Sequence, residues 1–99
     1  MKNELNFLEE LFQTIENKAK SKDNKSYTKK LLTRGKNTIA QKVGEESSEL
    51  IIDYLNGTKK RTIEEASDLI YHLFVLLYSK KIKLEDIRKE LKKRQNVQR

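Results

Sequence analysis

Residues 45–51 read EESSELI, and residues 64–70 return nearly the same letters as EEASDLI. Each copy lies in a stretch with the apolar spacing of a helix, and each has two acidic residues that project from one side of that helix. These residues are Glu46, Glu49, Glu65 and Asp68. Two such helices packed face to face bring four carboxylates together, which requires a cation or the uptake of protons. A hard divalent cation suits ligands that are all carboxylate oxygens.

The composition limits what the chain can be. It has 99 residues, no cysteine and a formal net charge of +7. This length predicts one small domain, and the lack of cysteine excludes a disulfide framework, a zinc ribbon and a thiol nucleophile. No apolar run reaches the ~20 residues of a membrane span, and the start lacks the order of a signal peptide. We therefore expect a soluble, cytoplasmic protein that does not bind a membrane.

The chain is expected to be all-α, a small bundle of four to five helices. It has no proline and three glycines, and no segment alternates as a strand would. Gly35 is placed to end a helix in a left-handed conformation, Asn37 or Thr38 can cap the next helix, and Thr58 or Thr62 can cap the one after it. The expected helices cover approximately residues 5–19, 27–33, 39–55 and 84–91, and a further helix runs from a cap at Thr58 or Thr62 to about residue 78.

Residues 69–78 are apolar on every side of their helix. A helix of this kind must be covered all round, and in so small a protein a second copy of the chain is a plausible cover. We therefore expect a homodimer, or at least an oligomer. Residues 1–92 are expected to form a single domain, followed by a basic, disordered tail at 93–99.

The positive charge lies outside the two acidic repeats. It suits an anionic partner, either nucleic acid or a polyphosphorylated small molecule, although a merely solvated surface is the better explanation of any single lysine. A small helical nucleic-acid-binding dimer is thus an alternative of a different class. It leaves the paired acids unexplained, because carboxylates that face phosphates without a metal are repulsive. We therefore expect no nucleic-acid partner.

One of the acids also has a purely structural interpretation. Residues 62–65 read TIEE, which matches a capping box in which the carboxylate of Glu65 returns to the backbone N–H of Thr62. Whether Glu65 is a metal ligand or a helix cap stays open at this point. The cap becomes less plausible if the helix begins at Thr58 instead.

The wider pattern resembles a known family. GEESSE at 44–49 followed by EASD at 65–68 is similar to the E-E-x-x-E and E-x-x-D signature of the all-α nucleoside-triphosphate pyrophosphatase superfamily, to which MazG belongs. SYT at 26–28, IAQKVGEE at 39–46 and DLIYHL at 68–73 resemble the phosphoribosyl-ATP pyrophosphatase (HisE) family of histidine biosynthesis. The resemblance extends from Leu5 to about residue 92. Ser47 and Ser48 depart from the family pattern, which alters packing more than chemistry.

The resemblance implies hydrolysis of the α–β phosphoanhydride of phosphoribosyl-ATP, giving phosphoribosyl-AMP and pyrophosphate. Mg²⁺ would be the cofactor, because carboxylate-held Mg²⁺ can screen phosphate charge and position water. Glu45 would be either a further ligand or the base that orients water, with Glu46 beside it as a catalytic residue. The implied metal ligands are Glu46, Glu49, Glu65 and Asp68. A general nucleoside-triphosphate pyrophosphatase is the closest alternative, since the acidic signature fits both.

Polar residues beside these acids are the candidates for substrate binding. Lys42 lies one turn before Glu46 and either meets a phosphate or forms an ion pair with Glu46. His72 either binds phosphate, orients Asp68 without binding the metal itself, or is a hydrogen-bonded core residue. Tyr27 either contacts ribose or base, or is a core anchor. The full set is Tyr27, Thr28, Arg34, Gly35, Lys36, Gln41, Lys42 and His72, of which residues 34–36 precede a helix N-terminus.

Overall fold

The structure, a computed structural model, describes residues 6–96. This part of the chain is entirely helical, as expected, and has no strand. The helices are α1 (Asn6–Lys20), α2 (Tyr27–Arg34), α3 (Lys36–Asn56), α4 (Lys59–Ser79) and α5 (Leu84–Asn96). Among these residues, none of the helices is both long enough and apolar enough to cross a membrane.

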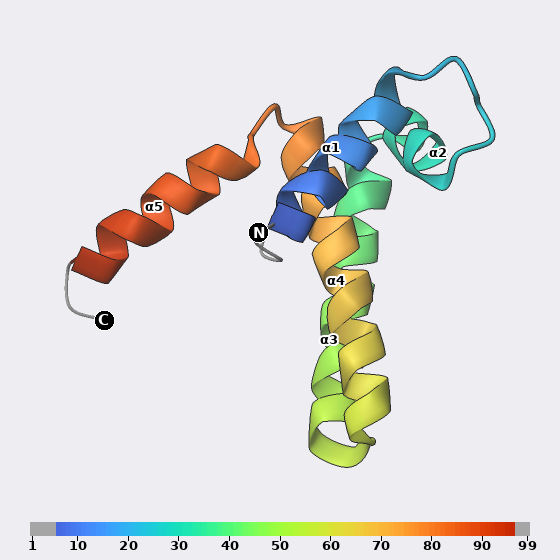
Figure 1. The fold of residues 1–99 in the computed structure, drawn as a ribbon. Helices are drawn as coiled ribbons and strands as arrows, with labels where there is room; N and C mark the ends of the chain where they lie inside the picture. Colours follow the sequence, from blue (N-terminus) through green and yellow to red (C-terminus); the bar gives the residue numbers. More distant parts are fainter. Residues whose placement is uncertain (1–5, 97–99) are drawn as a thin grey trace.

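The two longest helices, α3 and α4, form an antiparallel hairpin of 21 residues each (Figure 1). The link between them is short, with Gly57 ending α3 and Thr58 capping α4. The Thr58 hydroxyl accepts a hydrogen bond from the backbone N–H of Arg61 at 3.1 Å. Thr62 therefore lies inside the helix, and its hydroxyl donates to the Thr58 carbonyl instead. Of the two caps that the sequence allowed, Thr58 is the one observed.

Gly35 joins α2 to α3 without an intervening loop. Its φ is 98° and its ψ is 179°, a combination that residues with a Cβ rarely adopt, and its N–H bonds to the Leu31 carbonyl. The positive φ was expected. The cap of the next helix was predicted wrongly, because α3 begins at Lys36 with no side-chain cap, so neither Asn37 nor Thr38 serves.

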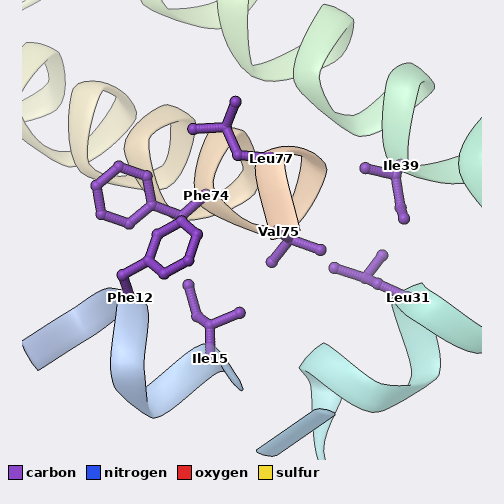
Figure 2. Packing of buried hydrophobic residues seen from close by; sticks show 7 residues of the cluster. All are labelled: Phe12, Ile15, Leu31, Ile39, Phe74, Val75 and Leu77. Carbon is purple, nitrogen blue, oxygen red and sulfur yellow. The ribbon is translucent and has the colours of Figure 1, made fainter. Parts of the chain in front are cut away.

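The core gathers at one end of the hairpin, where α1 and α2 pack against it. Phe12 and Phe74 form its aromatic contact, with ring centroids 5.3 Å apart and planes inclined at 59°. Figure 2 shows Phe12 and Ile15 of α1 and Leu31 of α2 pointing toward Phe74 and Val75 of α4. Burial of each such side chain contributes about 1.5–3 kcal/mol. The buried apolar residues are Phe12, Ile15, Leu31, Ile39, Phe74, Val75 and Leu77.

The apolar stretch at residues 69–78 is covered better within one chain than expected. Phe74, Val75 and Leu77 are buried, while Ile70 and Leu73 are each 39% exposed. Larger apolar exposure lies further along the hairpin, toward the turn between α3 and α4. We call this region the distal hairpin surface; it comprises Ile51, Ile52, Tyr54, Leu55 and Ile63.

The last helix is longer than the sequence suggested. Residues 93–96, which were assigned to a disordered basic tail, continue α5. In Figure 1 this helix projects away from the hairpin. Residues 97–99 and Leu5 lie outside the described residues.

Candidate functional site

The hairpin brings the two acidic repeats face to face. Glu46 and Glu49 on α3 meet Glu65 on α4, and each offers a carboxylate oxygen within 4.8 Å of the others. The spacing of three residues within α3 places its two acids one turn apart on the same side, as predicted. We call these three residues the carboxylate cluster.

Two members of the carboxylate cluster are buried. Glu46 is 7% exposed and Glu65 is 4% exposed. The Oε2 atom of each has no hydrogen-bond partner within the described part of the chain. Buried carboxylate oxygens without partners are costly, and a divalent cation that prefers oxygen ligands relieves that cost. These residues therefore fit Mg²⁺ in chemistry, in burial and in mutual distance.

The crowding changes the acidity of Glu65. Burial raises the pKa of its carboxyl group, and the nearby carboxylate of Glu49 raises it further. The positive charge of Arg61 acts in the opposite direction but does not outweigh these effects. Without a cation, Glu65 thus holds a proton more readily than a separate glutamate does.

Asp68 is less close than its spacing suggested. Its side chain is exposed, and it is not part of the group whose oxygens lie within 4.8 Å of one another. Its charge nevertheless raises the pKa of Glu65. The helical spacing placed Asp68 on the correct side of α4, but spacing alone does not give the depth at which a side chain lies.

Charged and polar side chains of α3 lie next to the carboxylate cluster. Lys42 Nζ lies 3.7 Å from Glu45 Oε1 and 3.9 Å from Glu46 Oε1, so the structure contains the ion pair that was one of its two expected roles. Gln41 donates from Nε2 to Glu45 Oε2 at 3.3 Å. The Glu45 side chain is 47% exposed, so it reaches solvent beside the buried acids.

His72 is a buried, fully hydrogen-bonded histidine that borders the site. Its Nδ1 bonds to the backbone carbonyl of Asp68 at 2.8 Å, and its Nε2 bonds to the Tyr27 hydroxyl at 2.9 Å. A carbonyl only accepts, so in the neutral ring Nδ1 carries the proton and Tyr27 donates to Nε2. Nδ1 also lies 3.9 Å from Glu46 Oε1. His72 thus supports Asp68 through the backbone, not through its carboxylate.

Tyr27 and Tyr71 form an aromatic pair next to this histidine. Their ring centroids are 6.0 Å apart with planes inclined at 24°, and Tyr27 is 48% exposed. Tyr27 is therefore not a core anchor, and about half of this residue is open to solvent. Thr28 is buried and its hydroxyl bonds to the Tyr71 hydroxyl. Thr28 holds Tyr71 in place, and burial raises the pKa of that tyrosine.

The predicted phosphate-binding residues 34–36 lie apart from the acids. Lys36 and Glu46 are separated by ten residues of α3, a rise of about 15 Å. Arg34 lines a basic hollow of about 350 Å³ with Asn24, Lys29, Lys30 and Thr33. Lys36 lines a different hollow of about 510 Å³ beside Phe12 and Tyr78. Only a long ligand would reach both the carboxylate cluster and this junction.

Arg61 is a contact of the site that the sequence analysis missed. Its Nη2 lies 2.6 Å from Glu65 Oε1, and its Nη1 lies 2.7 Å from Glu64 Oε1. This ion pair, with the helix start at Thr58, removes the capping-box interpretation of Glu65. The available signal was the spacing of four residues between Arg61 and Glu65, which is common on helix surfaces and says little without the burial of Glu65.

The fold and the site define a small all-helical protein with buried carboxylates that face each other across a helical hairpin. The family described as phosphoribosyl-ATP pyrophosphohydrolase matches residues 8–95, and the chain belongs to this family.

Named relatives agree with this assignment. The phosphoribosyl-ATP pyrophosphatase of Bacillus cytotoxicus is 46% identical over 87 residues, which cover 88% of this chain and 81% of that protein. The protein of the same name from Sulfurisphaera tokodaii is 47% identical, with 90% of this chain and 95% of that protein covered. The histidine biosynthesis bifunctional protein HisIE of Bacteroides thetaiotaomicron is 47% identical over 89% of this chain and 43% of that protein.

Proposed function

We propose that this chain hydrolyses phosphoribosyl-ATP at its α–β phosphoanhydride, releasing pyrophosphate and phosphoribosyl-AMP, as a step of histidine biosynthesis. The observation that carries the proposal is the pair of buried oxygens, Oε2 of Glu46 and of Glu65, that lack partners among residues 6–96 in a chain of this family. Such oxygens favour a bound cation, and a triphosphate is a natural ligand of that cation.

Mg²⁺ is the cofactor that we propose, held by Glu46, Glu49 and Glu65. When bound, it would supply charge neutralisation for the phosphate oxygens and lower the pKa of a bound water. Asp68, which is exposed beside Glu65, remains a candidate for a ligand reached through water or after a side-chain rotation. The number of carboxylates supports this proposal, because three acids with oxygens within 4.8 Å of one another repel and a cation would relieve that repulsion.

The residues around the carboxylate cluster have separate tasks in this proposal. Glu45 is half exposed and held by Gln41 and Lys42, so it is the best placed base to orient an attacking water. Lys42 would exchange its ion pair for a phosphate oxygen of the substrate. Tyr27, fixed by His72, offers an accessible ring face to the ribosyl or purine part of the substrate.

We also propose that the chain acts as a homodimer in the cytoplasm, where a substrate derived from ATP is found. The support for a second copy is the distal hairpin surface, on which several large apolar side chains are more than half exposed, among them Ile52 at 61% and Leu55 at 68%. An isologous dimer would cover them. No nucleic-acid partner is needed in this proposal.

The test is the release of pyrophosphate from phosphoribosyl-ATP, measured beside ATP and other nucleoside triphosphates, with Mg²⁺ and with EDTA. We expect release from phosphoribosyl-ATP only, and only with Mg²⁺. Comparable release from ordinary triphosphates would instead support a general nucleotide pyrophosphatase. No release from any nucleotide, together with tight and strongly salt-dependent binding of DNA or RNA, would reject an enzymatic role.

A further inference from the structure

We propose that Arg61 is a positioning residue for the cation site: it holds Oε1 of Glu65, so that Oε2 is left free for a divalent cation. The inference rests on the proposed function, because it presupposes that the carboxylate cluster binds a cation. It assigns a role to a residue that does not itself touch the cation, the substrate or the reacting atoms.

Arg61 contacts only one of the two carboxylate oxygens of Glu65. Oε1 accepts from Nη2 of Arg61 at 2.6 Å. Oε2 is buried and has no hydrogen-bond partner in the described residues. A charge-assisted hydrogen bond of this length fixes the carboxylate plane, because rotation about the last side-chain bond would move Oε1 away from the guanidinium. The rotation that would exchange the two oxygens is therefore disfavoured.

Arg61 is itself held from several directions. Its other terminal nitrogen, Nη1, donates to Glu64 Oε1 at 2.7 Å. Its Nη2 also lies 3.9 Å from Asp53 Oδ2, which comes from α3 across the hairpin. Its backbone N–H is bound by the capping hydroxyl of Thr58. The planar guanidinium uses both ends of its fork, and a lysine at this position would offer only one point of contact.

The two oxygens of the other buried acid, Glu46, also differ in their surroundings, although its contacts are ion-pair distances and not hydrogen bonds. Oε1 of Glu46 lies 3.9 Å from Lys42 Nζ and 3.9 Å from His72 Nδ1, while its Oε2 is buried without a partner among residues 6–96. Each buried carboxylate thus has one oxygen near a basic side chain, Arg61 for Glu65 and Lys42 for Glu46, and one buried oxygen without a partner among residues 6–96. Partners that orient the ligands of a metal in this way are a general feature of metal sites.

A simpler role for Arg61 predicts the opposite sign. If Arg61 only neutralises Glu65, it competes with a cation. Its removal should then strengthen cation binding, because the Coulomb repulsion between the guanidinium and the cation is lost. If Arg61 positions Glu65, its removal should weaken cation binding although a positive charge has been taken away. The Arg61 side chain is 54% exposed, so solvent screens its repulsion of a cation while the hydrogen bond to Glu65 stays local.

The experiment is a titration of substrate-free protein with Mn²⁺, followed by electron paramagnetic resonance, with Mg²⁺ as a competitor. We expect Arg61→Gln to weaken Mn²⁺ binding by ~10-fold or more, the range seen when partners of metal ligands are removed. The Mn²⁺ affinity of Arg61→Lys should lie between that of Arg61→Gln and that of the wild type. Lys60→Gln is the matched control, since it removes the same charge from the neighbouring exposed position and should bind Mn²⁺ as tightly as the wild type or slightly more tightly.

The outcomes separate the two proposals. If the wild type binds no Mn²⁺, the metal site of the proposed function fails and the role of Arg61 fails with it. If the wild type binds Mn²⁺ and Arg61→Gln binds it equally or more tightly, Arg61 is a counter-ion only, and the proposed function stands. If circular dichroism shows that Arg61→Gln has lost helix, Arg61→Lys takes its place, and wild-type affinity in that folded variant overturns the positioning role.

Discussion

At the scale of single residues, burial separates glutamates that the sequence presents as equals. Glu45 and Glu49 reach solvent, whereas Glu46 and Glu65 are buried with one oxygen each left unpaired. A buried carboxylate is a good cation ligand, because the carboxylate has already lost its hydration and the bound cation compensates for that loss. The chemistry of the site therefore depends most on these two residues.

Glu65→Gln provides the first test at this scale. In the metal-free protein the pKa of Glu65 lies above its ordinary value of 4.5, mainly because of burial. A raised pKa in the folded state gives stability that is complete below the unfolded value and is lost as pH rises through the folded value. The neutral glutamine avoids this loss. With EDTA at pH 7, we expect the variant to melt at the same temperature as the wild type or higher.

The same variant should lose function. We expect kcat for pyrophosphate release to fall by about 10²–10³-fold, the typical cost of one electrostatic group at a reacting centre. Thermal melts between about pH 4 and 8 should show the stability difference shrinking on acidification, because the wild-type carboxylate becomes protonated. A variant that is less stable at every pH but fully active would mean that Glu65 has only a structural role.

The sequence predicted much of the carboxylate cluster but not its limits. Glu46, Glu49 and Glu65 were expected from the repeat and the helical angle, and their oxygens do approach one another. The depth of Asp68 was not predictable, because the angle around α4 does not tell how that helix is rotated against α3. Arg61 was overlooked because an ion pair at four residues' spacing matters only once one partner is known to be buried.

At the scale of elements, the hairpin turn has two functions. The Thr58 hydroxyl caps α4 by accepting a hydrogen bond from the backbone N–H of Arg61. Because Arg61 lies four residues before Glu65, the same bond helps to fix the residue that contacts Glu65. Across the turn, the Thr62 hydroxyl shares its proton between the Thr58 carbonyl and, at 3.2 Å, the Asp53 carbonyl of α3. The start of α4 thus sets the position of Glu65 opposite the acids of α3. A defect in this turn should affect both stability and the site.

We expect Thr58→Ala to destabilise the protein by ~1 kcal/mol, the usual cost of losing an N-cap. Thr58→Ser should retain most of the stability, since serine offers the same acceptor. Thr14→Ala on the exposed face of α1 is the matched control. Its hydroxyl donates to the Glu10 carbonyl within the same helix, so alanine should be neutral or slightly stabilising there. Urea denaturation measures all three, and equal losses for Thr14→Ala and Thr58→Ala would contradict the cap.

The existence of the helices was easier to predict than their ends. Apolar periodicity located all five helices, because α1 to α4 each have buried side chains and α5 has the partly buried Leu84 and Ile87. The start of α3 at Lys36 was missed because Gly35 serves both α2 and α3, which leaves no room for a separate cap. The end of α5 was missed because its last turns are polar, and periodicity has no apolar side to follow there.

At the scale of the whole molecule, the two ends of the hairpin differ. The end that holds Ile39 and Val75 is packed against α1 and α2, while the distal hairpin surface has no cover from the described residues. Ile51 and Leu55 lie one turn apart on α3, so they present one continuous apolar strip. Exposed strips of this kind are typical of association surfaces.

The last prediction follows from this asymmetry. Ile52→Glu should weaken self-association by ~100-fold or more, because a dimer would bury an unpaired charge at a cost of several kcal/mol. Sedimentation velocity at micromolar concentration should then show a monomer for this variant and a dimer for the wild type. Leu91→Glu, at a similarly exposed position on α5, is the control and should leave the dimer intact. A monomeric wild type would exclude the dimer, and dissociation caused by Leu91→Glu but not by Ile52→Glu would move the interface from the hairpin to α5.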